Sequence, residues 1–211
     1  MNEKVNDMKP QEIERESFSI IQRELKEMGK ELSERTAPIV VRCIHTSADF
    51  SYADTLAFSD GAIDTAMDLL RNGATVVTDT NMALAGIRSR QLARFGGRAV
   101  CFMADEAVAD EAKQRETTRA FVSMEHAAKL DGPVIFAIGN APTALLSLHE
   151  MIAAEAYRPD FVIGVPVGFV NVEAAKEMIM GDGIPYIVNR GRKGGSSIAA
   201  AIVNALLGMA G

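Results

Sequence analysis

The chain has 211 residues, and its 22 lysine and arginine residues against 28 aspartate and glutamate residues give a formal net charge of −6. A composition of 48% hydrophobic and 24% charged residues excludes disorder as the main state, because disordered chains are poor in apolar residues. The acidic balance argues against a general nucleic-acid-binding protein, which needs a basic surface, although a local group of arginines can still hold small anions.

The cysteines and histidines limit the metal and redox chemistry of the chain. Cys43 and Cys101 form no CxxC pair, and the three histidines show no zinc-ligand spacing such as HExxH. The first residues hold no apolar signal segment, and no stretch approaches the roughly 20 apolar residues that cross a bilayer. We therefore expect a soluble cytoplasmic protein with reduced thiols and no bound metal, and neither nucleic acid nor membrane as a partner.

The predicted elements begin with a polar segment over residues 1–11, which we expect to be flexible. An apolar stripe over residues 12–28 predicts the first helix. Residues 33–47 are ambiguous, because β-branched residues at 39–41 favour a strand while apolar residues at helical spacing favour a helix. We favour the helix, on which Arg42 and His45 share one face.

A regular alternation of helices and strands follows. Ser59 can cap a helix that runs to residue 70. Short apolar runs predict strands at residues 75–78, 98–102, 134–138, 161–164 and 185–188, and helical patterns follow at residues 82–93, 107–129, 142–156, 173–180 and 196–207. This alternation predicts one three-layer α/β/α domain over residues 12–211, with a mostly parallel, doubly wound sheet of five strands of the flavodoxin-like kind.

The segment after the last predicted strand carries the strongest signal of a binding site. In doubly wound sheets, ligands bind beyond the carboxyl ends of the strands. Arg190, Arg192 and Lys193 place three positive charges there, and Gly194 and Gly195 then open a helix whose backbone N–H groups favour anions. We interpret the segment as a site for carboxylates or phosphates, with a solvated basic turn as the alternative. The P-loop and GxGxxG patterns are absent, so nucleotide binding has no support.

Other candidate residues each have a functional and a structural interpretation. His45 is a candidate general acid or base, although a single histidine is more often structural. Asn140 lies in a turn that either offers backbone donors to a ligand or only connects a strand to a helix. Arg119, one turn after Arg115 on the predicted long helix, is either an anion clamp or part of a solvated face, and the solvated face is favoured. A nucleophilic Cys43 is a minor alternative.

A series of short motifs occurs in order along nearly the whole chain. They are Glu16-Ser17-Phe18, Arg42-x-x-His45, Asp79-x-x-Met82, Thr118-Arg119, GNAPTAL at residues 139–145, GVPVGFV at residues 164–170 and RGRKGGS at residues 190–196. Together these motifs resemble the precorrin-8X methylmutase (cobalt-precorrin-8 methylmutase) family of corrin biosynthesis.

The resemblance implies a reaction and an assembly. The reaction is the migration of a methyl group from carbon 11 to carbon 12 of precorrin-8X or cobalt-precorrin-8, which gives hydrogenobyrinic or cobyrinic acid. The resemblance further implies proton transfer by His45, substrate contacts from Ser17 and Arg42, no cofactor, a flavodoxin-like fold and a homodimer. A non-catalytic tetrapyrrole carrier is the alternative function.

A macrocycle with many acetate and propionate carboxylates suits the basic residues of the chain. With the resemblance, the expected substrate-binding residues are Ser17, Arg42, Thr118, Arg119, Asn140, Arg190, Arg192, Gly194 and Gly195. Because one chain of this size is small beside such a ligand, we expect the site to lie near a dimer interface.

Overall fold

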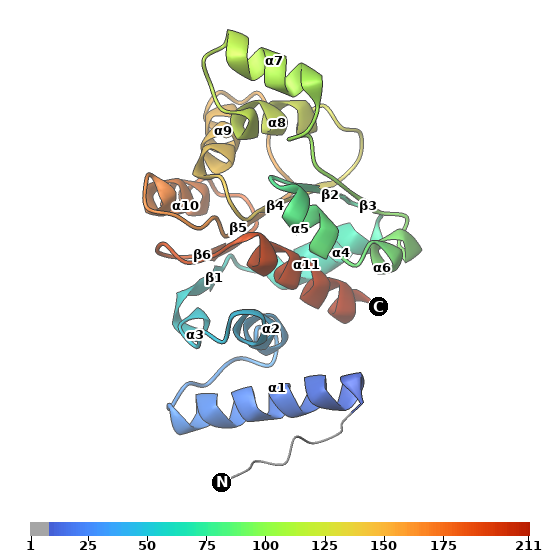
Figure 1. Ribbon diagram of the computed structural model, residues 1–211, viewed down its shortest axis with the longest axis vertical. Coiled ribbons are helices and arrows are strands. Elements are labelled where there is room, and N and C mark those ends of the chain that lie inside the picture. Colours follow the sequence, from blue (N-terminus) through green and yellow to red (C-terminus); the bar gives the residue numbers. More distant parts are fainter. Residues whose placement is uncertain (1–8) are drawn as a thin grey trace.

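The computed structural model describes residues 9–211 of the chain (Figure 1). The helices are α1 Pro10–Glu27, α2 Ala37–Ser47, α3 Tyr52–Thr55, α4 Ala62–Arg71, α5 Asn81–Gly86, α6 Ser89–Arg94, α7 Glu106–Gln114, α8 Arg119–Ala127, α9 Pro142–Ala153, α10 Val172–Gly181 and α11 Ser196–Ala210. The strands are β1 Leu56–Phe58, β2 Thr75–Thr78, β3 Arg98–Val100, β4 Val134–Ile138, β5 Phe161–Gly164 and β6 Tyr186–Asn189. Within the described residues, no helix has the length and apolar character needed to cross a membrane.

The strands form one sheet in the order β1-β6-β5-β4-β2-β3. Five strands are parallel, and β1 lies antiparallel against β6 at one edge. The prediction of a five-stranded sheet is therefore wrong, because it omits the edge strand β1. β1 has three residues, all only partly buried, so it lacks the continuous apolar run that marks the interior strands.

Side chains of the interior strands alternate between two hydrophobic cores. Val76, Ile135 and Ile163 pack with residues of α2, α4 and α11, whereas Val77, Phe136 and Val162 pack with residues of α8, α9 and α10. Figure 1 shows these helices on opposite sides of the sheet, with α1 outermost against α2. Both faces of the sheet are covered, which is why its strands read as continuous apolar runs.

Residues 37–47 of the ambiguous segment form helix α2, which confirms the helix over the strand, and residues 34–36 before it form a turn. Pro38 lies in the first turn, where its missing N–H costs nothing. The helix ends at Ala48, which has a left-handed backbone and donates its N–H to the carbonyl of Ile44. The β-branched residues at 39–41 are buried, so tertiary packing overrides their strand propensity.

The predicted helix over residues 82–93 is two helices, α5 and α6. Gly86 approaches α11 so closely that an added Cβ would lie 2.8 Å from the Cβ of Ala200. Asn204 of α11 accepts the N–H of Arg88 at 2.8 Å and donates to the carbonyl of Gly86 at 2.8 Å. These bonds replace the helical partners at the break between α5 and α6.

The predicted helix over residues 107–129 is also divided, into α7 and α8. Glu116 has a left-handed backbone with φ of 51°, and the Thr118 hydroxyl caps α8 by accepting the N–H of Phe121 at 3.1 Å. The expected cap at Ser59 is wrong as well, because Gly61 is the N-cap of α4 and the Ser59 hydroxyl accepts the N–H of Tyr186. The expectation of a flexible segment over residues 1–11 falls mainly on residues 1–8, outside the described residues, and α1 begins at Pro10.

Candidate functional site

Asp79 joins two loops at the carboxyl edge of the sheet. It follows β2, is fully buried, and accepts the backbone N–H groups of Gly139, Asn140 and Ala141 at 2.8, 2.8 and 2.6 Å. Burial raises the pKa of the Asp79 carboxyl, and the three N–H donors oppose that shift. The buried carboxylate of Asp79 therefore holds the backbone of the turn between β4 and α9, and Asn140 is exposed at the tip of that turn.

Two glycines allow the segment after β6 to approach the neighbouring loops closely. We call residues 190–195 the basic loop. A Cβ on Gly194 would lie 2.0 Å from the carbonyl oxygen of Val165, and the N–H of Gly195 donates to the same oxygen at 2.9 Å. A Cβ on Gly139 would lie 2.7 Å from Cα of Ser196. The start of α11 therefore lies against the turn that carries Asn140, which brings Asn140, Gly194 and Gly195 together.

The cations of the basic loop are paired with carboxylates that are exposed or partly exposed. The Nε atoms of Arg190 and Arg192 lie 3.7 and 2.8 Å from carboxylate oxygens of Glu177 and Glu173 on α10. Lys193 lies 2.6 Å from Asp49, in the loop after α2. Ion pairs this exposed are worth little, so an incoming carboxylate can displace the acidic partner at small cost. These cations remain suited to an anionic ligand.

A second group of candidate residues lies between α1 and α2. The Arg42 guanidinium is bonded to Glu14 and lies 4.7 Å from the centre of the Phe18 ring. The His45 ring meets the same Phe18 ring edge to face, with 5.3 Å between their centres. Arg42 and His45 therefore share one face of α2, as predicted. Arg42 holds the pKa of the Glu14 carboxyl below its usual value.

Ser17 lies on α1 next to Phe18, and its hydroxyl donates to the carbonyl of Ile13 at 2.8 Å. Neighbouring positions of a helix do not face each other, so being next to Phe18 does not bring Ser17 to Arg42 and His45. The bond that the Ser17 hydroxyl makes lies within its own helix.

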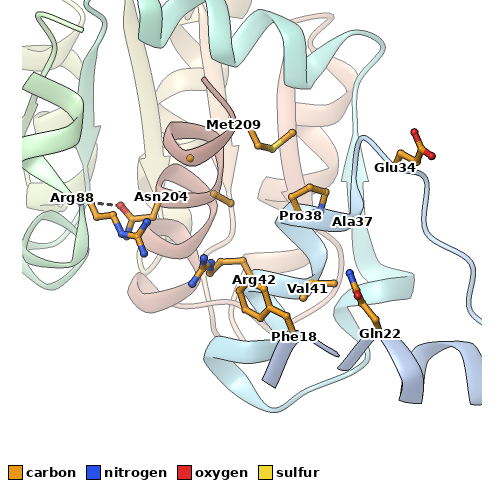
Figure 2. A pocket seen from close by; sticks show the side chains of 12 residues that line it. Phe18, Gln22, Glu34, Ala37, Pro38, Val41, Arg42, Arg88, Asn204 and Met209 are labelled. Carbon is orange, nitrogen blue, oxygen red and sulfur yellow. Dashed lines mark hydrogen bonds between the residues drawn. The ribbon is translucent and has the colours of Figure 1, made fainter. Parts of the chain in front are cut away.

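Two hollows connect this group to the start of α11. The first has a volume of about 560 Å³ and lies between α1, α2 and α11; Figure 2 shows Phe18, Arg42, Arg88 and Asn204 on its wall. The second, of about 370 Å³, shares Arg42, Arg88 and Asn204 with the first. The second also reaches Ser197 at the start of α11. A groove thus runs from Phe18 towards the basic loop.

The long helix that would place Arg115 and Arg119 together as an anion clamp, the less favoured of the two interpretations, is not present. Arg115 is the C-cap of α7 and pairs with Glu111 and Glu125, whereas Arg119 begins α8 and is exposed. The Thr118 hydroxyl donates to that of Thr143 at 2.9 Å, which places Thr118 and Arg119 beside the start of α9. Arg119 therefore lies near the turn that carries Asn140, on the other face of the sheet from α2.

Cys43 is not a nucleophile in this structure. Its side chain is fully buried in the core between α2 and the sheet. Burial raises the pKa of its thiol to about 12, so the reactive thiolate is scarce near neutral pH.

Sequence reasoning missed several polar residues that shape the site. Lys176 is buried under the basic loop, and Asn204 and Arg88 line both hollows. A signal existed for two of them. Lys176 interrupts an apolar stripe at helical spacing on α10, and Asn204 interrupts the long apolar run of α11.

Comparison with known proteins identifies the family. The profile of a family described as precorrin-8X methylmutase matches residues 12–209. The chain belongs to the precorrin-8X methylmutase family. The cobalt-precorrin-8 methylmutase of Salmonella typhimurium is 42% identical over 202 residues, which cover 94% of each chain. That of Priestia megaterium is 41% identical over 199 residues, which cover 94% of this chain and 88% of the relative.

A solved structure agrees with the sequence comparisons. The crystal structure of a precorrin-8X methylmutase from Thermus thermophilus matches this chain with a TM-score of 0.84 and 37% identity, over 94% of this chain and 96% of that one. The resemblance drawn from the motifs is therefore confirmed. Membership of the precorrin-8X methylmutase family makes the chain an isomerase of corrin biosynthesis.

Proposed function

We propose that the protein moves the methyl group on carbon 11 of precorrin-8X, or of cobalt-precorrin-8, to carbon 12, which gives hydrogenobyrinic or cobyrinic acid. Family membership over residues 12–209 supports this reaction. The structural observation that carries it is the placement of Arg42 and His45 on one face of α2, both against Phe18, with Arg42 and Phe18 on the wall of the groove. An anion-binding guanidinium next to an exposed imidazole suits acid–base chemistry on a ligand with carboxylate side chains.

The ring carboxylates are bound, in this proposal, by cations and backbone donors along the carboxyl edge of the sheet. Exposed guanidinium groups form charge-assisted bonds with carboxylates and also fix orientation when both oxygens are engaged. The N–H of Gly194 and the starts of α8 and α11 add further donors, because the N–H groups just before α9 are already bonded to Asp79. The proposed binding residues are Ser17, Arg42, Thr118, Arg119, Asn140, Arg190, Arg192, Gly194 and Gly195.

His45 supplies the proton in this mechanism. As an imidazolium it protonates, or donates a hydrogen bond to, the conjugated ring system of the substrate. The withdrawal of electrons assists migration of the methyl group, and the proton returns to the imidazole afterwards, so the reaction is a net isomerisation. Acid–base help of this kind is worth about 10²–10⁴-fold, and orientation of the ring supplies further acceleration.

The proposal extends to the fold type, the assembly and the location of the enzyme. Counted along the chain, the parallel strands lie in the order 2-1-3-4-5, which supports a flavodoxin-like domain over residues 12–211 with one antiparallel strand added. Hollows of about 560 and 370 Å³ suit small ligands, so a large macrocycle favours a homodimer with the site near its interface. Both cysteines are free, which supports a cytoplasmic enzyme.

The test is an anaerobic absorbance time course with excess precorrin-8X, repeated with cobalt-precorrin-8. We expect many turnovers by the protein and a loss of about 10²–10⁴-fold in kcat for His45→Ala, which changes an exposed side chain and keeps the fold. His149→Ala is the matched control, because His149 bonds to Asp182, at the end of α10 away from the basic loop. A spectral shift that stops at one equivalent would instead point to a carrier or to product that is held too tightly for release. Full activity of His45→Ala would refute the role of His45.

A further inference from the structure

Lys176 is a buried cation with no acidic partner among the described residues. It lies on α10 with 0% of its surface exposed, and no described carboxylate lies within ion-pair distance of its ammonium group. A lysine is rarely buried without a paired charge, because the ammonium loses its hydration. Its retention in the core requires a specific set of acceptors.

Those acceptors are carbonyl groups of the basic loop. The Lys176 ammonium donates to the carbonyl oxygens of Gly191 and Lys193 at 2.7 and 2.9 Å. The buried amide of Asn189 donates to the same Lys193 oxygen at 2.8 Å, and the N–H of Gly168 donates to the carbonyl of Arg192 at 3.1 Å. Three successive carbonyls of the basic loop are therefore bonded to other parts of the protein, which fixes the backbone path between β6 and α11.

The same helix also holds the side chains of the basic loop. Glu173, Lys176 and Glu177 lie three and four positions apart, so they share one face of α10. From this face the two glutamates pair with Arg192 and Arg190, while Lys176 holds the main chain between those arginines. Burial lowers the pKa of Lys176 to about 8, and the charge of Glu173 partly opposes the shift, so the ammonium stays mainly charged near neutral pH.

We propose that Lys176 is a positioning residue for substrate binding, which sets the backbone of the basic loop so that Arg190 and Arg192 meet the carboxylates of the substrate. Lys176 does not touch the substrate, and its effect passes through the carbonyls of Gly191 and Lys193. The identity of the substrate in this inference rests on the proposed function. The positioning role of Lys176 rests only on the hydrogen bonds that its ammonium makes to the basic loop.

The test combines steady-state kinetics on precorrin-8X with hydrogen exchange of the ligand-free protein. Lys176→Met removes the charge and both donors while it keeps an unbranched apolar stem. We expect KM to rise about tenfold to hundredfold, with kcat within about threefold. The lost bonds from the Lys176 ammonium hold the loop that binds the substrate, whereas the groups that take part in the reaction are unchanged. The backbone amides of residues 190–195 are expected to exchange faster in the variant. Lys176→Gln, which keeps one amide donor, is measured beside it in case the Met variant does not fold.

Arg158→Met is the matched control. Arg158 also donates from a basic side chain to a glycine carbonyl. Its bond to the carbonyl of Gly183 measures 2.6 Å and lies just after the C-terminal end of α10. Its loss is expected to leave both KM and loop exchange unchanged. A folded Lys176 variant with unchanged KM, or with a loss confined to kcat, overturns the proposal, and so does failure of both variants to fold. If the wild-type protein turns over neither substrate, the proposed function fails, and unchanged amide exchange still overturns the positioning role separately.

Discussion

The guanidinium of Arg42 is occupied before any substrate arrives. Glu14 reaches it from α1, and the side chains of the pair are 19% and 41% exposed. Phe18 supports the guanidinium from one side and the His45 ring from another. In the proposed site, a substrate carboxylate on Arg42 meets the negative charge of Glu14 at the same guanidinium, so the two carboxylates compete.

Replacement of Glu14 by glutamine removes that competition. We expect Glu14→Gln to lower KM for the methylmutase substrate about two- to fivefold with little change in kcat, because a partly exposed ion pair is worth on the order of 1 kcal/mol. Initial rates over a range of substrate concentrations measure the effect. Glu27→Gln is the control, since Glu27 lies on α1 like Glu14 but pairs with Arg23, which is not a residue of the proposed site. A higher KM in Glu14→Gln would mean that Glu14 orients Arg42 for the substrate.

At the scale of elements, Asp79 connects the end of β2 to the turn between β4 and α9. Its two carboxylate oxygens accept three backbone N–H groups in a buried site. An asparagine has one acceptor oxygen there, and its amide group would face N–H donors. We expect Asp79→Asn to cost about 3 kcal/mol of unfolding free energy, which lowers Tm by roughly 6–12 °C in a chain of this length.

Thermal unfolding of the purified protein measures this cost. The control is Asp160→Asn, because Asp160 is exposed and accepts one backbone N–H, from Val134 at the start of β4. We expect a loss below about 1 kcal/mol for the control. Equal losses in the two variants would show that the turn before α9 does not depend on Asp79.

The interior of the fold could be predicted from the sequence because it depends on local patterns. β2, β4 and β5 are short apolar runs between turns, and their bounds match the predicted ranges. The breaks at Gly86 and Glu116 could not be predicted in the same way. They depend on a partner from α11 and on a left-handed residue, and the apolar spacing continues across both.

The candidate site shows the same division between local and tertiary information. Arg42 and His45 share a helix, so their common face follows from spacing alone. The pairing of Arg190 and Arg192 with α10 depends on how α10 packs beside β6, which no local pattern encodes. Lys176 was missed for the same reason, although its place in an apolar stripe was visible.

At the scale of the whole molecule, the proposed binding residues lie on two sides of one sheet. Arg42 and His45 belong to α2, which packs with α11 on one face, whereas Arg119 begins α8 on the other face (Figure 1). The turn with Asn140 and the start of α11 lie between them at the edge of the sheet. A two-fold homodimer can bring α2 of one subunit to α8 of the other, and an isologous interface then forms two equivalent sites.

Complementation between inactive variants tests this arrangement. His45→Ala and Arg119→Ala are each expected to lose activity alone. When they are coexpressed, a mixed dimer with shared sites contains one site that has both residues intact, so about a quarter of the wild-type rate returns in a statistical mixture. The control mixes His45→Ala with Arg42→Ala. Both residues lie on α2, so no activity returns whether or not the sites are shared. Absence of recovery in the first mixture, with mixed dimers verified by mass, would place His45 and Arg119 in the site of a single subunit.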